Sequence, residues 1–145
     1  MTPGGFAIGL HIGFSGPTFL FQTFPPAWVD YYADQGLQLK DPAVRWGFEN
    51  TGAIRWRELT DQDPADVIGK ARKYGLKNGV TLSIVDAQSR TVAGCARSDR
   101  DYLDFEIEQI HGKLLALHRA TMGLSVLSEA DMAALKRMSI RLSHT

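Results

Sequence analysis

The segment from Phe24 to Tyr32 is rich in aromatic side chains, contains two consecutive prolines and is followed by a carboxylate at Asp41. Prolines suit the first turn of a helix, so Trp28 and Tyr32, four residues apart, are predicted to share one helical face. Tryptophan and tyrosine each combine an apolar body with a polar tip that can donate a hydrogen bond. Such a face either fills a core or lines a binding pocket, and both interpretations stay open.

Asp41 directly precedes Pro42, which is the pattern of a helix N-cap followed by a first helical residue. Capping is therefore the simplest role for this carboxylate. If Asp41 faces an apolar pocket instead, it needs hydrogen-bond donors to be tolerated there, and the amide of a bound ligand would supply one. The two roles are compatible, because a carboxylate has two oxygens with several acceptor positions.

Other reactive groups form neither a catalytic pattern nor a metal-binding one. Cys95 is the single cysteine of the chain, which excludes an internal disulfide and fits a reducing compartment. On a predicted strand, Cys95 is either a small buried hydrophobe or a weak thiol donor. The four histidines are scattered along the sequence, without a nucleophile–base pair or the spacing of metal ligands. We expect no enzyme activity, no metal and no cofactor.

Composition sets the class of protein. The chain has 145 residues, enough for one domain, with 44% hydrophobic and 22% charged residues and a net charge of zero. A neutral chain lacks the electrostatic footprint of a nucleic-acid-binding or membrane-surface protein. No stretch reaches the roughly 20 apolar residues of a membrane-spanning helix, and the first residues do not form a signal peptide. We therefore expect a cytoplasmic protein that does not contact membranes.

Apolar patterning around these residues predicts an α/β domain. Two apolar runs joined by a turn rich in glycine predict an antiparallel hairpin, and a second pair of alternating runs predicts another. Asn78-Gly79 is interpreted as a turn dipeptide before the second pair. In chain order, the predicted elements are strands 6–12 and 18–23, helix 25–35, a short helix from Pro42, an extended segment 53–56, helix 64–74, strands 80–85 and 91–96, helix 104–122 and a last helix from 127.

Trp28, Tyr32, Asp41-Pro42, Trp56 and the run 74–81 follow one another in the order and at the intervals typical of a known family. Over roughly residues 5–117 the chain resembles the autoinducer-binding domain of LuxR-type quorum-sensing regulators. The resemblance implies an α/β/α sandwich, with a central, mainly antiparallel sheet of about five strands between helices. It also implies that residues 1–123 form this domain without its usual first helices. Residues 124–145 would then be a linker and the first helix of a truncated helix-turn-helix domain.

The resemblance further implies non-covalent binding of an N-acyl-homoserine lactone, the signal ligand, between sheet and helices. Trp28 would donate its indole N–H to the lactone carbonyl, and Trp56 would pack against the lactone ring. Asp41, with help from Tyr32, would read the polar head group of the ligand.

Two positions depart from the family pattern, although both belong to the predicted site. Phe24 stands where the family usually has a tyrosine that bonds the amide carbonyl of the ligand, and phenylalanine cannot make this bond. Cys95 stands where the family often has a small hydroxyl residue, and a thiol is a weaker donor. These departures leave the identity of the preferred ligand open.

As for partners, the resemblance implies a small-molecule autoinducer and pairing with a second copy or with a homologue. DNA would be bound only through a helix-turn-helix domain that is incomplete in this sequence. An alternative function therefore stays open. The chain would be a dimerisation or interaction module without a DNA-reading domain, and it would pair with an intact homologue and inhibit it.

Overall fold

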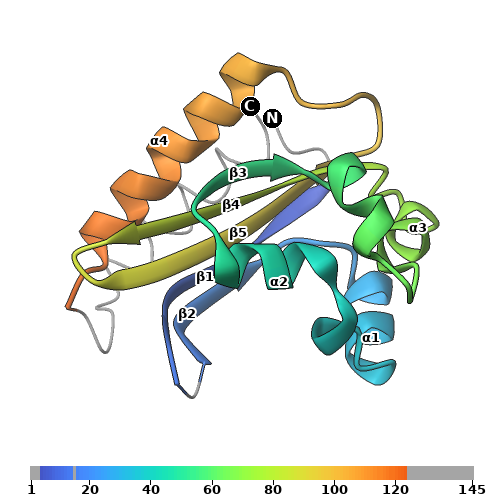
Figure 1. Cartoon of the computed structure of the whole chain (residues 1–145), viewed down its shortest axis with the longest axis horizontal. Helices are drawn as coiled ribbons and strands as arrows, with labels where there is room; N and C mark the ends of the chain where they lie inside the picture. Colours follow the sequence, from blue (N-terminus) through green and yellow to red (C-terminus); the bar gives the residue numbers. More distant parts are fainter. Residues whose placement is uncertain (1–3, 15, 124–145) are drawn as a thin grey trace.

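The structure of the chain, a computed structural model, describes residues 4–14 and 16–123. Its centre is an antiparallel sheet of five strands in the order β2-β1-β5-β4-β3. Helix α4 lies across one face of this sheet, whereas α1, α2 and α3 gather on the other side (Figure 1). The predicted α/β/α arrangement, with its mainly antiparallel five-stranded sheet, is confirmed.

The strands and helices have the following bounds: β1 (Gly5–Gly13), β2 (Gly16–Gln22), α1 (Pro26–Asp34), the short 3-10 helix η1 (Leu37–Lys40), α2 (Pro42–Glu49), β3 (Gly52–Arg55), the 3-10 helix η2 (Trp56–Gln62), α3 (Val67–Arg72), β4 (Asn78–Asp86), β5 (Ser89–Arg97) and α4 (Asp104–Ala120). The predicted elements are thus present up to α4. The helix predicted from residue 127 lies outside the described residues.

Two local predictions need correction. The helix predicted over 64–74 is shorter, because both carboxylate oxygens of Asp63 accept backbone N–H bonds, from Val67 and Ile68, and so fix the start of α3 at Val67. The predicted turn at Asn78-Gly79 is wrong, because both residues lie at the beginning of β4 and pair with β5.

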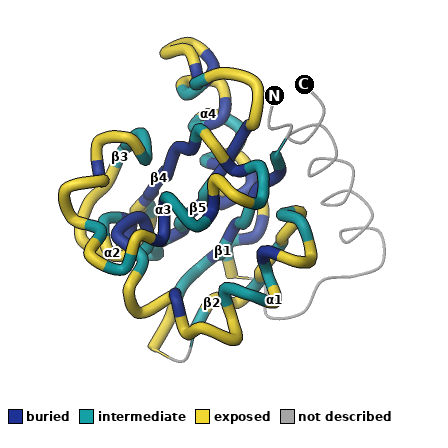
Figure 2. The backbone as a smooth tube through the Cα atoms, turned by 90° about the vertical axis from the view of Figure 1, so that its right-hand side faces the viewer, coloured by how far each residue is buried: buried dark blue, intermediate teal, exposed yellow. Residues whose placement is uncertain are grey.

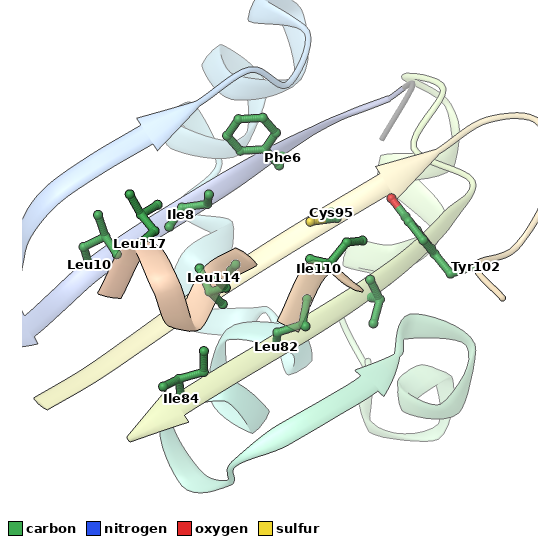
Figure 3. Close-up of a cluster of buried hydrophobic side chains, with 12 residues drawn as sticks. Phe6, Ile8, Leu10, Leu82, Ile84, Cys95, Tyr102, Ile110, Leu114 and Leu117 are labelled. Carbon is green, nitrogen blue, oxygen red and sulfur yellow. The ribbon is translucent and has the colours of Figure 1, made fainter. Parts of the chain in front are cut away.

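The core between the sheet and α4 follows from the alternation of strand residues. Every second side chain of β1, β4 and β5 points toward α4, and apolar residues of α4 meet them (Figure 3). The labelled members of this buried cluster are Phe6, Ile8, Leu10, Leu82, Ile84, Cys95, Tyr102, Ile110, Leu114 and Leu117. Figure 2 shows the same division along the backbone, with buried segments in the central strands and exposed ones in β2 and the loops.

On the opposite face, α2 is held close to the sheet through a glycine. A Cβ atom at Gly47 would lie only 2.6 Å from a methyl carbon of Val92 on β5, so a larger residue would push α2 away. The carbonyl oxygen of Gly47 accepts hydrogen bonds from the hydroxyl of Ser83, at 2.6 Å, and from the guanidinium of Arg90, at 2.7 Å. These contacts fix one wall of the space between α2 and the sheet.

Two histidines that are distant in the sequence meet where β1 reaches the last turn of α4. The ring centroids of His11 and His118 are 4.4 Å apart. Nε2 of His11 lies 3.0 Å from the carbonyl oxygen of His118, and Nε2 of His118 lies 3.0 Å from that of Asp86. A ring nitrogen that faces a carbonyl oxygen must donate a hydrogen bond. The other ring nitrogen, Nδ1, faces the hydroxyl of Ser89 in His11 and the hydroxyl of Thr91 in His118.

The stability of the fold is expected to decrease on mild acidification because of His11. Burial, and next the neighbouring His118, lower the pKa of His11 below 6.5, although the His118 carbonyl acts in the opposite direction. The unfolded chain therefore binds a proton near pH 6.5 while the folded chain resists it. The contribution of the neutral His11 ring to the free energy of unfolding is intact above pH 6.5. It is lost as the pH falls through 6.5 toward the lowered pKa of His11.

Chemical denaturation at pH 7.5 and 5.5 measures this effect. His11→Asn serves as the comparison, because His11 has a φ of 52° and asparagine tolerates that backbone conformation. The variant removes the titrating ring, so its free energy of unfolding should change less between the two pH values than that of the wild type. Equal pH dependence in both proteins would contradict the assignment to His11.

Candidate functional site

A cavity of about 1050 Å³ lies between the sheet and the helices of the face opposite to α4. Its floor is formed by strand residues, and its walls come from α1, η1, α2, α3 and the beginning of η2. This volume is at the upper end of the range of small-molecule pockets, about 300–1,000 Å³. Five residues predicted from the sequence line it together: Phe24, Trp28, Tyr32, Asp41 and Trp56.

Aromatic rings make one wall of the cavity. Trp28 is only 5% exposed, and its ring centroid lies 5.4 Å from those of Tyr32 and Tyr74 in tilted arrangements. The predicted stacking of Trp28 and Tyr32 on one helical face is confirmed. Phe24 packs against the same cluster and presents an apolar ring to the cavity, without a hydroxyl. The wall is therefore largely apolar, and its polar atoms are few and fixed.

The two tryptophans of the cavity differ in how their indole N–H groups are used. Trp56 donates to the hydroxyl of Thr81 at 2.9 Å. Within residues 4–14 and 16–123, no group accepts a hydrogen bond from the indole N–H of Trp28, whereas its backbone N–H donates to the carbonyl of Pro25. A donor that lines a mostly apolar cavity without a protein partner is available to a guest molecule. Trp28 therefore has both a packing role and a free polar tip.

Asp41 caps α2, and its carboxylate also lies at the cavity, where Tyr32 supplies a hydrogen-bond donor. One carboxylate oxygen accepts from the backbone N–H of Ala43 at 2.9 Å, which confirms the N-cap of α2. The other accepts from the phenol hydroxyl of Tyr32 at 2.9 Å, beside the cavity. Burial raises the pKa of Asp41, although the bonds from Tyr32 and Ala43 act in the opposite direction. The pKa of Tyr32 is also raised, first by burial and then by the adjacent carboxylate.

The ring of Trp56 lies against Gly79 of β4, a residue that the sequence analysis placed in a turn. A Cβ atom at Gly79 would lie 1.9 to 2.4 Å from atoms of the Trp56 ring, so only glycine leaves room for the indole there. Thr81, two residues further along β4, receives the indole hydrogen bond. In the sequence, Gly79 and Thr81 are a glycine and a β-branched hydroxyl residue two positions apart. This spacing indicates a place for an indole ring only when β4 is known to lie under Trp56.

Cys95 is the predicted site residue that the structure does not bring to the cavity. Its side chain is 3% exposed and packs among the residues beneath α4, on the other face of the sheet (Figure 3). Successive strand residues point to opposite faces, so the neighbouring Gly94 faces the cavity instead. Burial raises the pKa of the Cys95 thiol to about 12. The expectation that Cys95 contacts the ligand is therefore corrected, and its alternative role as a buried small hydrophobe fits.

Comparison with protein families identifies the cavity-bearing domain. The family model described as the autoinducer binding domain matches residues 11–121. The chain belongs to this family. The LuxR-type resemblance is confirmed. In this autoinducer-binding domain, the matched span includes the cavity residues from Phe24 to Gly94.

Relatives of this autoinducer-binding domain include named regulators. The transcriptional activator protein YukR of Yersinia ruckeri is 26% identical over 125 residues, which cover 74% of this chain and 55% of the relative. The HTH-type quorum-sensing regulator RhlR of Pseudomonas aeruginosa is 30% identical over 105 residues, which cover 71% of this chain and 44% of RhlR. The chain thus spans about half the length of these relatives. By name, YukR is a transcriptional activator and RhlR is a quorum-sensing regulator.

Solved structures with the same fold include two further proteins. The N-acylhomoserine lactone dependent LuxR family transcription factor CepR2 of Burkholderia cenocepacia matches with a TM-score of 0.61 at 16% identity, covering 83% of this chain and 74% of its own. Escherichia coli SdiA matches with a TM-score of 0.57 at 20% identity, and the match covers 97% of this chain and 56% of the SdiA chain. These likenesses establish the fold. In the described part of the chain, no helix has the length and apolarity to cross a membrane, and no cluster of side chains could hold a metal ion.

Proposed function

We propose that the cavity senses an N-acyl-homoserine lactone by non-covalent binding. The observation that supports this proposal most strongly is the pairing of a free donor and a fixed acceptor in one apolar cavity. Among the residues that the structure describes, the indole N–H of Trp28 has no acceptor, and the Asp41 carboxylate is held in place by Tyr32 and by the start of α2. An acyl-homoserine lactone carries the complementary groups, namely a ring carbonyl, an amide N–H and an apolar tail.

Each polar group has a defined task in this proposal. Trp28 donates to the lactone carbonyl, which removes the cost of burying that oxygen. Asp41 accepts the amide N–H, since each of its oxygens keeps a free lone pair beside its existing bond. Tyr32 keeps the carboxylate oriented, and the ring of Trp56 packs against the head group. The acyl tail is driven into the cavity by the hydrophobic effect.

Solved structures of similar fold include SdiA in complex with octanoyl-rac-glycerol and CepR2, which is dependent on N-acylhomoserine lactone. Both ligands join an apolar chain to a small polar head. For this chain, the carboxylate beside the indole donor favours a ligand that contains an amide N–H, because a charge-assisted bond to a carboxylate is stronger than a neutral one.

The experiment is a thermal-shift and calorimetric titration of the full chain with lactones from butanoyl to dodecanoyl. A ligand that binds only the folded state raises the melting temperature in proportion to the logarithm of its concentration over Kd. Homoserine lactone without an acyl chain and octanoyl-glycerol serve as controls for the tail and the amide. Absence of a shift with every lactone would overturn the proposal, and equal affinity for the glycerol ester would remove the argument from the amide.

Trp28→Phe is expected to weaken lactone binding while leaving most of the aromatic wall in place. The variant keeps a ring against Tyr32 and Tyr74 but removes the indole N–H. Loss of one neutral hydrogen bond of about 0.5–1.5 kcal/mol corresponds to a roughly two- to twelvefold higher Kd. Titration calorimetry measures the change. Trp46→Phe, outside the cavity lining, is the matched control, and an equal loss of affinity in both variants would contradict a specific role of the Trp28 donor.

A further inference from the structure

The floor of the cavity contains a strip that is almost free of side chains. Gly94 on β5 pairs with Thr81 on one side and with Ala7 of β1 on the other, and all three face the cavity. Two residues further along β1, Gly9 also faces the cavity and pairs with Leu20 of β2. The strip therefore begins beside Trp56 and Thr81, at the polar end, and crosses β5 and β1 toward β2.

Packing does not explain the glycines of this strip. A Cβ atom at Gly9 would lie 3.5 Å from Pro17 and 3.7 Å from Ile12, and one at Gly94 would lie 3.7 Å from Trp56. These are ordinary contact distances, unlike the collision at Gly79. Neither glycine has a φ that other residues avoid. Glycine inside a strand costs stability relative to alanine, so what the two glycines provide is the empty space above them.

The far end of the strip opens to solvent among exposed apolar side chains. Leu20 is 63% exposed and Leu39 is 92% exposed, and both line the cavity together with the exposed Phe14. From β4 to β2 the strip crosses three interstrand spacings of about 4.8 Å, or roughly 14 Å. An extended dodecanoyl tail covers such a distance and would bury the apolar rim at its end.

We propose that the strip over Gly94, Ala7 and Gly9 is the track of the acyl tail, and that it selects long-chain lactones whose ends reach Leu20. This inference rests on the proposed lactone binding and adds the chain-length class and the residues that set it. The lining of the cavity includes Gly94, Gly9 and Leu20 alike, so we expect affinity to rise with each added methylene until the tail reaches Leu20. Burial of one methylene, about 0.8 kcal/mol, corresponds to roughly a fourfold gain in affinity.

The test compares the Kd of butanoyl-, octanoyl- and dodecanoyl-homoserine lactone in the full chain and in variants. Gly9→Leu places a side chain on the track, and Gly9→Ala is the milder variant that ordinary contacts accommodate. Leu20→Ser removes the apolar rim, and Val85→Ser is its matched control, an exposed strand residue that does not line the cavity. Melting temperatures of the unliganded variants show that each one folds.

For the wild type, we expect dodecanoyl-homoserine lactone to bind at least a hundredfold tighter than the butanoyl ligand. Gly9→Leu should abolish most of this ratio without weakening the butanoyl ligand, Gly9→Ala should reduce it, and Leu20→Ser should affect only the dodecanoyl ligand. A wild type that prefers the butanoyl ligand, or Gly9 variants with an unchanged ratio, would overturn the track while lactone sensing stands. Binding of no lactone at all would instead overturn the proposed function.

Discussion

Asp41→Asn is expected to raise the Kd for the tightest-binding acyl-homoserine lactone about tenfold or more. The substitution keeps the size of the side chain and removes its charge, so the bond to the ligand amide is no longer charge-assisted. Hydrogen bonds to charged groups contribute roughly 1.5–3 kcal/mol, and about 1.4 kcal/mol corresponds to a factor of ten in affinity. Titration calorimetry of both proteins against the same lactone gives the ratio directly.

The melting temperature of unliganded Asp41→Asn should stay close to that of the wild type. Asparagine caps helices about as well as aspartate, so the bond from the Ala43 N–H, in the first turn of α2, to the side-chain oxygen of residue 41 is kept. The variant also loses a carboxylate whose burial is unfavourable. If affinity and stability fall together, Asp41 acts through α2 alone. Unchanged affinity would remove Asp41 from the binding site.

Lowering the pH should weaken lactone binding in the same way as Asp41→Asn does. Because burial raises the pKa of Asp41, its charge is lost at a higher pH than that of an exposed aspartate, and the folded site then offers a neutral carboxyl group. Lactone affinity in the wild type should therefore fall as the pH is lowered toward that pKa. Asp41→Asn lacks the titrating group and provides the baseline, so affinity titrations of both proteins between pH 7.5 and 5 isolate the contribution of Asp41.

Gly79→Ala is expected to be the most damaging single-methyl change near the cavity. The added Cβ would occupy the position of the Trp56 ring, so the indole must move and the bond to Thr81 is strained or lost. Overpacking of this kind costs about 1–3 kcal/mol, and the lost hydrogen bond adds about 0.5–1.5 kcal/mol. Chemical denaturation should show this lower free energy of unfolding, and lactone binding should weaken because Trp56 leaves the head-group end.

Gly112→Ala is the matched control for that variant. Gly112 is an exposed residue of α4, and nothing lies within 4 Å of the position of an added Cβ. Alanine is favoured over glycine in a helix by about 1 kcal/mol, so this variant should be slightly more stable and should bind lactone as the wild type does. Equal stability of Gly79→Ala and the wild type would mean that Trp56 does not need its place over β4.

Much of the architecture could be predicted because local signals were unambiguous. The Asp41-Pro42 pair placed the start of α2, and Gly36, with a φ of 59°, lies where the first helix was predicted to end. Of the residues that carry the family resemblance, Trp28, Tyr32, Asp41, Trp56 and Thr81 line one cavity, since their spacing and their order in the chain were both informative. These features depend on neighbours within a few positions of each residue.

The missed features depend on pairing across the sheet. Strand register decides which face Cys95 occupies, and a shift by one residue would have exchanged it with Gly94. Asn78-Gly79 has the composition of a turn, but Trp56 from another element imposes the glycine. His11 of β1 and His118 of α4 meet directly and through Thr91 of β5, which lies next to β1. No local pattern in the sequence contains this adjacency.

The same adjacency governs the order in which the protein can assemble. β1 and β2, like β4 and β5, are neighbours in the chain and can pair early, whereas Phe6 and Cys95 must find each other across most of the sequence. Contacts between such distant residues slow folding. The seam between β1 and β5 runs under the cavity, since Ala7 and Gly94 are partners across it. During synthesis β1 is made before β5, so the edge of β1 that pairs with β5 stays unpaired until β5 has been made. Under the proposed function, a lactone would therefore meet a complete cavity floor only after β1 and β5 have paired.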